Sequence, residues 1–166
     1  VELFEARKPK GQAKITQVAG KVQIEDAGQT KKVVITDDKG EEHSYVISRR
    51  ADITVEDGQM VQAGDQLYKG SLNPHELLKY RGALATARYI VGEVQDVYHK
   101  QGVQIDDKHV ELIVRQMTKK VLVETPGDTS FLPGRMVDRL IFDDENAQVV
   151  ENGGEPATCE EIILGI

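Results

Sequence analysis

The sequence predicts an α+β fold in which a segment of three helices lies between N-terminal and C-terminal strands. Up to residue 70, short β-branched and apolar runs alternate with Asp-Gly and Gly-Asp turns, which is typical of a small barrel or sandwich. From residue 74 the apolar residues recur at spacings of three and four, which indicates helices. From Val121 the chain returns to strand-like runs separated by Pro-Gly turns.

Length and composition restrict the possibilities further. A chain of 166 residues permits one ordinary domain or two very small ones. With 39% hydrophobic and 30% charged residues, the composition excludes a disordered or membrane-spanning chain. Residues 121–166 hold two basic and ten acidic residues, a charge of −8, whereas the rest of the chain is close to neutral, so this segment accounts for the net charge of −7. No signal peptide is visible at the start of the chain. Because the chain begins at Val1 without an initiator Met and ends on the apolar residues 163–166, we expect a piece of a longer protein.

The first 70 residues divide into two predicted parts. Residues 1–10 resemble the tail of a helix that Pro9 stops, and residues 11–70 form a β unit. Within that unit we expect strands over residues 13–25, 32–36 and 44–47, with a turn at residues 37–40. Residues 53–67 supply further short strands and turns.

Residues 71–120 form the predicted helical segment. Asn73 is a good N-cap and Pro74 a good first helical residue, so a short helix runs to residue 81 and is interrupted near Gly82. A longer helix follows, over residues 83–101. A third begins after Asp106 or Asp107. The predicted apolar stripes are Leu84, Ala87, Val91, Val94 and Tyr98 on the longer helix, and Val110, Ile113, Val114 and Met117 on the third.

Residues 121–166 form a predicted C-terminal β segment. Turns are expected at residues 125–128, 132–134 and 152–156, and one strand runs from Met136 through Phe142. The three helices are therefore either an insertion between two halves of one β unit or a hinge between two small units.

No catalytic or metal-binding motif is evident. The four histidines are scattered and lack the spacing of metal ligands. Cys159 lies beside two carboxylates that raise a thiol pKa, which argues against a nucleophile. The acidic runs lack the alternating ligands of a calcium loop, and the glycines lack a Walker lysine. We therefore expect no catalytic residue, no metal site and no bound cofactor.

A remote alternative is a carrier domain. Residues 18–22, 38–40 and 58–67 loosely resemble swinging-arm carriers, which hold a modified lysine at a hairpin tip, and Lys39 occupies such a tip. This interpretation leaves residues 71–166 unexplained.

Several stretches resemble one family closely, in order along nearly the whole chain. They are ELFEARKPK (2–10), GSLNPHELL (70–78), YIVGEVQDVY (89–98), DDKHVELIVRQM (106–117), FLPG (131–134) and ILGI (163–166). These stretches are similar to the C-terminal part of the beta-prime subunit of bacterial RNA polymerase, between the trigger loop and the first switch region.

The resemblance implies a non-catalytic module of a nucleotidyltransferase, built on a sandwich-barrel hybrid β fold. In this family the region forms the downstream jaw, which bounds the channel for duplex DNA ahead of the active site and supports the trigger loop and clamp. The magnesium and zinc of the whole enzyme are bound elsewhere. The implied partners are the rest of beta-prime, the beta subunit, downstream duplex DNA and transcription regulators, with no membrane.

A DNA channel of this kind needs phosphate contacts, because a translocating enzyme cannot depend on base readout. The candidate phosphate-binding residues are Arg7, Lys8, Lys10, Arg49, Arg50, Lys79 and Arg81. The first three follow the trigger-loop segment and are the strongest candidates. The alternative is an interaction scaffold whose acidic tail and apolar helix faces dock on other polymerase regions or regulators without touching DNA.

Overall fold

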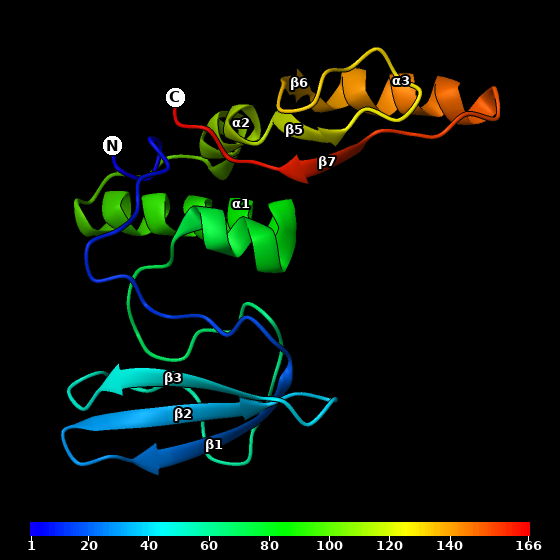
Figure 1. Cartoon of the computed structure of the whole chain (residues 1–166). Helices are drawn as coiled ribbons and strands as arrows, with labels where there is room; N and C mark the ends of the chain where they lie inside the picture. The colour runs from blue at the N-terminus through cyan, green and yellow to red at the C-terminus, as the bar shows by residue number, and fades with distance from the viewer. The chain divides into compact units, whose positions relative to one another are not determined.

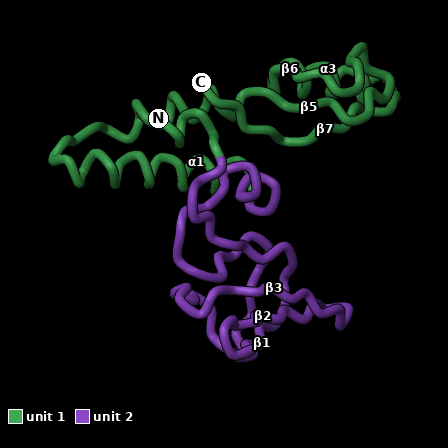
Figure 2. The backbone as a smooth tube through the Cα atoms, turned by 60° about the vertical axis from the view of Figure 1, so that its left-hand side comes forward, with its two compact units in different colours: residues 1–7, 82–166 green, residues 8–81 purple.

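The computed structural model describes residues 1–166. The chain divides into two compact units, one of residues 8–81 and one of residues 1–7 and 82–166 (Figure 2). We call them the β unit and the helical unit. Two antiparallel sheets and three helices confirm the α+β class. No helix is long and apolar enough to cross a bilayer.

The β unit is built on a four-stranded antiparallel sheet. Its strands are β1 (Gly20–Asp26), β2 (Thr30–Thr36), β3 (Glu42–Ser48) and β4 (Met60–Val61), in the order β3-β2-β1-β4. The first three lie side by side in Figure 1. Alternate residues of β1 and β2 point into the core, so that Val22, Val33 and Ile35 pack with Ile47 and Leu67. Two-residue side-chain periodicity therefore fixes which face is buried.

Irregular segments complete this unit. Isolated bridges from Gln12 to Ser71 and from Ile15 to Gln66 connect the segment before β1 to the segment after β4, and a third bridge, from Ile53 to Tyr68, connects the segments on either side of β4. The strand expected over residues 13–25 is shorter than predicted and begins at Gly20. The other two predicted strands and the turn at residues 37–40 are confirmed.

Helix α1 (Pro74–Lys100) begins as predicted and contains a break. The backbone N–H of His75 donates to the Asn73 side chain at 3.1 Å, which is N-cap geometry. Gly82 interrupts the helical dihedral angles with φ 80° and ψ 176°, a region that only glycine adopts without strain. A Cβ at Gly82 would meet no atom within 4 Å. Backbone conformation, and not crowding, therefore requires glycine here.

We expect Gly82→Ala to lower the free energy of unfolding by about 1–3 kcal/mol, because alanine is strained at this φ and ψ. Gly92 is the matched control. It lies in regular helix and also has open space around a Cβ, so Gly92→Ala should raise the free energy of unfolding by about 1 kcal/mol. Urea denaturation of both variants measures the difference. Equal effects of the two substitutions would contradict the conformational explanation.

The helical unit contains the rest of α1 and helix α2 (Asp107–Met117). Asp106 caps α2, since its side chain accepts the N–H of Lys108 at 3.1 Å. Gly102, with φ 71°, follows α1 as predicted. The stripe predicted for α2 is largely confirmed, with Val110, Val114 and Met117 buried. The stripe predicted for α1 is only partly correct, because Val94 is its one buried member and Leu84 is 65% exposed, whereas Ile90, outside the predicted stripe, is fully buried.

The C-terminal part forms a separate three-stranded sheet with its own helix. Strands β5 (Lys120–Thr125), β6 (Met136–Asp138) and β7 (Thr158–Glu161) have the order β6-β5-β7, and α3 (Arg139–Glu151) packs against β5 and β6 (Figure 1). The strands before and after the helices thus form two separate sheets, one in each unit.

The strand predicted from Met136 through Phe142 is wrong beyond residue 138. Asp138 accepts the N–H of Leu140 at 3.1 Å and starts α3. The apolar run that follows is helical because Phe142 reaches the core of Val121, Val123 and Ala157. Asp138 also pairs with Lys119 at 3.0 Å, and the hydrogen bond from Lys119 lowers the pKa of this carboxyl.

Both ends of the chain lie in the helical unit. Residues 1–10, predicted to be a helix tail, contain no helix; residues 2–6 form turns, with the N–H of Glu5 donating to the Val1 carbonyl at 3.0 Å. The N–H of Ile166 donates to the Phe4 carbonyl at 3.0 Å, and the N–H of Leu164 donates to the Met117 carbonyl at 2.9 Å. The first and last residues therefore lie side by side.

Candidate nucleic-acid interface

Charge is distributed unequally between the two units. The β unit carries 12 basic and 11 acidic residues, whereas the helical unit carries 9 basic and 17 acidic residues. A phosphate backbone is attracted by positive potential. The β unit is therefore the better candidate for contact with nucleic acid, and six of the seven predicted phosphate-binding residues lie in it.

The three strongest candidates are exposed. Arg7 ends the N-terminal segment of the helical unit and pairs with Glu5 at 2.7 Å. Lys8 and Lys10 begin the β unit and make no ion pair within the chain. Two of the three cations are thus free to bind an anion, and their role in DNA binding stays a prediction.

Arg49 and Arg50 directly follow the end of β3. The guanidinium of Arg49 donates to the Gly28 carbonyl at 2.9 Å and lies 4.0 Å from the Asp26 carboxylate. Arg50 is exposed without an ion pair. The guanidinium of Arg49 therefore lies against the turn between β1 and β2.

The strand register brings two further cations to this end of the sheet. Lys31 of β2 is opposite Ile47 of β3, and Lys32 is opposite Val46. Lys32 lies 3.9 Å from Glu25, an exposed and weak ion pair, and Lys31 has none. The four residues Lys31, Lys32, Arg49 and Arg50 define what we call the basic sheet end. Sequence reasoning missed the two lysines because only the register places them near the arginines.

The remaining two candidates lie at the start of α1. Lys79 is exposed, with its ammonium 5.4 Å from the centre of the Tyr80 ring. Arg81 pairs with Asp65 at 2.7 Å, and its side chain covers Gly64, where a Cβ would lie 2.5 Å from Arg81 Cγ. Arg81 thus has a packing role within the β unit, and its charge is partly offset.

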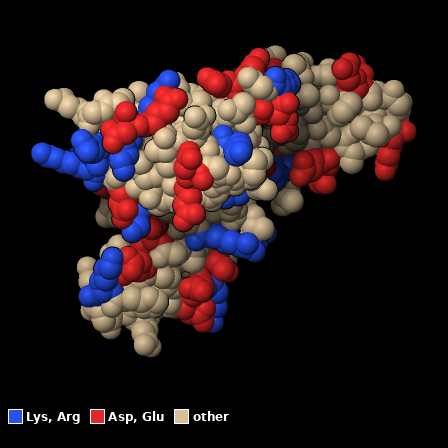
Figure 3. Space-filling view, turned by 90° about the horizontal axis from the view of Figure 1, so that it is seen from below, with Lys and Arg blue, Asp and Glu red and all other residues tan.

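Basic and acidic side chains are interspersed over the face shown in Figure 3. A mixed surface of this kind gives a weak, salt-sensitive attraction for DNA and no basis for reading sequence.

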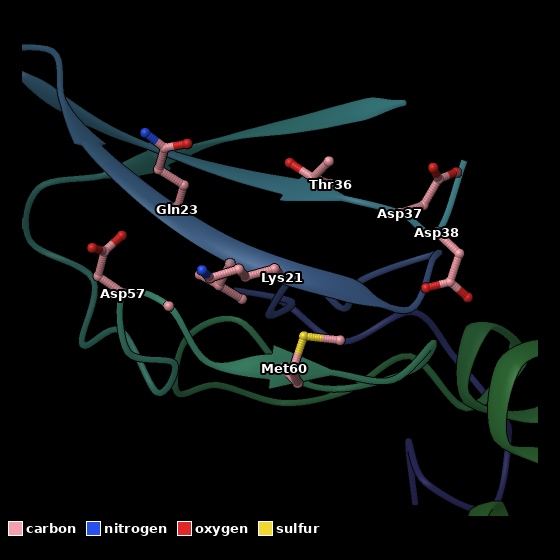
Figure 4. A pocket seen from close by; sticks show the side chains of 9 residues that line it. Lys21, Gln23, Thr36, Asp37, Asp38, Asp57 and Met60 are labelled. Carbon is pink, nitrogen blue, oxygen red and sulfur yellow. The ribbon is translucent and has the colours of Figure 1, made fainter. Parts of the chain in front are cut away.

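A hollow beside β1 is lined by a lysine and three carboxylates of the β unit. Lys21, Asp37, Asp38 and Asp57 line it together with Met60 (Figure 4). Asp57 accepts the N–H of Ile24 at 2.8 Å, and Asp37 accepts those of Lys39 and Glu41, each at 2.9 Å. Two of the three carboxylates therefore hold backbone turns in place.

Asp37, Glu41 and His43 lie close together at the turn between β2 and β3, with candidate ligand atoms within 4.8 Å of one another. This cluster was not predicted, because the hairpin between β2 and β3 brings its three side chains together. The hydrogen bond from the N–H of Glu41 is the main cause that lowers the pKa of Asp37. Lys39 is exposed at the tip of this turn, as predicted.

Cys159 is half-buried in β7. Burial is the main cause that raises the pKa of its thiol, and Asp143, Glu161 and Glu124 raise it further. The direction agrees with the sequence prediction, although Asp143 and Glu124 come from other elements. A thiol with a raised pKa is a poor nucleophile.

Known proteins that resemble this chain are RNA polymerase subunits. Residues 2–153 match the family described as RNA polymerase Rpb1, domain 5. The chain is 51% identical over 165 residues to the DNA-directed RNA polymerase subunit beta′ of Acetivibrio thermocellus, covering 99% of this chain and 14% of that protein. It is 51% identical over 167 residues to the same subunit of Acidothermus cellulolyticus, covering 100% of this chain and 13% of that protein.

A third relative is the beta′ subunit of Thermoanaerobacter pseudethanolicus, 49% identical over 166 residues, with coverage of 99% and 14%. The chain thus spans about a seventh of the length of these relatives. An identity of about one half over the whole chain, together with the family match, leads to one conclusion: the chain belongs to the RNA polymerase Rpb1 domain 5 family and is part of a bacterial RNA polymerase beta′ subunit.

Proposed function

We propose that this chain is a non-catalytic module of the polymerase that bounds the channel for downstream duplex DNA and supports the trigger loop and clamp. In this proposal the nucleotidyl transfer, the magnesium and the zinc of the whole enzyme belong to parts of the complex outside this chain. The enzyme acts in the bacterial cytoplasm, and the module's partners are the remaining subunits, the DNA and transcription regulators.

The observation that carries the proposal is the set of unpaired cations on the β unit, among them the exposed Lys8, Lys10 and Arg50 and the half-buried Lys31. Duplex DNA that moves through an enzyme must be held by contacts that are the same at every register, and phosphate contacts have this property. Scattered cations among acidic neighbours provide such contacts without halting movement.

We expect the triple variant Arg7→Gln/Lys8→Gln/Lys10→Gln, made in the full subunit and assembled into polymerase, to shorten the lifetime of open complexes. Each phosphate contact contributes about 0.9 to the slope of log affinity against log salt, so three lost contacts reduce the slope by about 2.7. Challenge with competitor DNA at several salt concentrations measures both quantities.

The matched control is Lys100→Gln/Lys108→Gln/Lys120→Gln, which removes three exposed lysines of the acidic helical unit. The same change in the basic sheet end, Lys31→Gln/Lys32→Gln/Arg49→Gln/Arg50→Gln, tests the second cluster. If neither the Arg7/Lys8/Lys10 variant nor the basic-sheet-end variant differs from the control, the DNA contact is refuted.

The second candidate function is an interaction scaffold within the polymerase. It is favoured by the apolar stripe of α1, of which Leu84 is exposed and Ala87 and Val91 are half-buried. An apolar helix face that the chain's own core leaves uncovered is typical of a docking surface.

A further inference from the structure

The exposed part of the α1 stripe lines a groove within the helical unit. Leu84, Ala87, Val91 and Gly92 of α1 form one side, and residues of α2 form the other. The groove has a volume of about 1070 Å³, which is at the upper end of small-ligand pockets. It follows α1 from Ala83 to His99, so its length suits a row of side chains better than one small molecule.

The connection between the two helices fixes the groove's walls. The side-chain N–H₂ of Gln95 donates to the Ile105 carbonyl at 2.6 Å and to the Asp107 carboxylate at 2.8 Å. Because both partners only accept hydrogen bonds, the orientation of the amide is determined. Gln95 is buried and ties the end of α1 to the start of α2, from which α2 runs back along the groove.

The charges that line the groove are divided between its two ends. Asp107 and Glu111 occupy the first half of α2, close to Gln95, and Asp96 lies next to Gln95 on α1. Arg88 and Arg115 lie farther from this junction, one on each helix. Asp96 pairs with Lys100, but Glu111 and both arginines make no ion pair within the chain. The groove therefore has an acidic end and a basic end with charges available to a partner.

The walls also limit the conformation of an occupant. Both are helices, whose backbone groups are already hydrogen-bonded, so they offer no partner to an extended strand. An occupant that buries its backbone here must satisfy it internally, as an α-helix does. At Gly92 a Cβ would meet no atom within 4 Å, so a second backbone has room to approach closely.

We propose that this groove binds an amphipathic α-helix of the polymerase from outside this chain, with its N-terminus toward Asp107 and its C-terminus toward Arg88 and Arg115. The helix macrodipole places partial positive charge at the N-terminus and partial negative charge at the C-terminus, which matches the two ends of the groove. About six-sevenths of each relative's length lies outside this chain, which supplies abundant candidate helices. The inference rests on family membership and does not depend on DNA contact.

Cysteine labelling tests whether the groove is covered. Ala87→Cys and Gly92→Cys are compared in the isolated 166-residue chain and in assembled polymerase, with Lys39→Cys at the exposed hairpin tip as the labelling control and peptide mapping to separate the signal from Cys159. We expect assembly to slow maleimide labelling of both groove cysteines about tenfold or more, because the bound helix must leave the groove before the maleimide can reach the thiol. Equal labelling rates in the two forms would overturn the proposal.

Photo-crosslinking tests the identity and direction of the occupant. A benzophenone amino acid at Leu84, near the basic end, and another at Asp96, near the acidic end, are introduced separately into the full subunit. We expect both to crosslink to one helical segment of the polymerase, Leu84 toward its C-terminal end and Asp96 toward its N-terminal end. The proposal would be refuted by crosslinks to a second copy of this chain or to non-helical segments. It would also be refuted if Leu84 crosslinked to the N-terminal end of the helix and Asp96 to its C-terminal end. The same crosslinks should form when the subunit also carries the Arg7/Lys8/Lys10 substitutions. The groove can therefore be tested independently of the proposed DNA contact.

Discussion

Replacing Phe142 by alanine is expected to lower the free energy of unfolding of the C-terminal sheet and α3 by about 3–5 kcal/mol. Phe142 is 5% exposed and packs with Val121, Val123 and Ala157. Its ring also stacks on Phe131, with centroids 5.5 Å apart. The substitution therefore removes buried apolar surface, an aromatic pair and the main contact of α3 with the sheet.

Hydrogen exchange of the 166-residue chain locates this effect. Amides of β5, β7 and α3 should exchange faster in Phe142→Ala, while amides of β1 to β3 keep their protection and serve as the internal reference. Leu140→Ala is the matched control, because Leu140 is on the same helix and 67% exposed. A comparable loss of protection in the Leu140 variant would show that the Phe142 contacts are not the cause.

The second large effect is expected at Gly20, the first residue of β1. A Cβ there would lie 2.1 Å from the Thr36 carbonyl oxygen and 2.7 Å from its carbon. Both atoms belong to the backbone of β2, so no side-chain rearrangement relieves the overlap. Gly20→Ala should separate β1 from β2 and lower the free energy of unfolding by about 3 kcal/mol, the upper end of the range for overpacked sites.

Denaturant titration and hydrogen exchange of β1 and β2 measure this loss. Gln23→Ala is the control within the same strand, because the Gln23 side chain is exposed and its removal should change stability by less than about 0.5 kcal/mol. Retained protection of β1 amides in Gly20→Ala would contradict the close approach of the two backbones. In assembled polymerase the same variant should also weaken any DNA contact made through the β unit.

Much of the local structure was predictable. Asn73, Pro74 and Asp106 mark helix starts through hydrogen bonds or dihedral angles that involve only neighbouring residues. Gly82 and Gly102 mark a break and an end for the same reason. The family was also evident from the sequence, because the resembling stretches are long and occur in order along the chain.

The candidate interface was predictable only in part. Sequence reasoning identified Arg49 and Arg50 but not Lys31 and Lys32, which reach the same sheet end only through the register of β2 and β3. It identified Arg81 as a cation but not its pairing with Asp65. Pairing across the sheet and across loops depends on residues far apart in the chain, and local patterns carry no information on it.

The sequence by itself determined the element types where local signals agree, the α+β class and the membership of the polymerase family. Tertiary structure alone decided that residues 139–142 are helical, since an apolar run of that length fits a strand or a helix until it meets the core around Phe142. It also decided that Leu84, Ala87 and Val91 line an open groove, although their spacing is that of a core-facing stripe. Periodicity shows which residues share a face, but only the packing of the whole chain determines what covers that face.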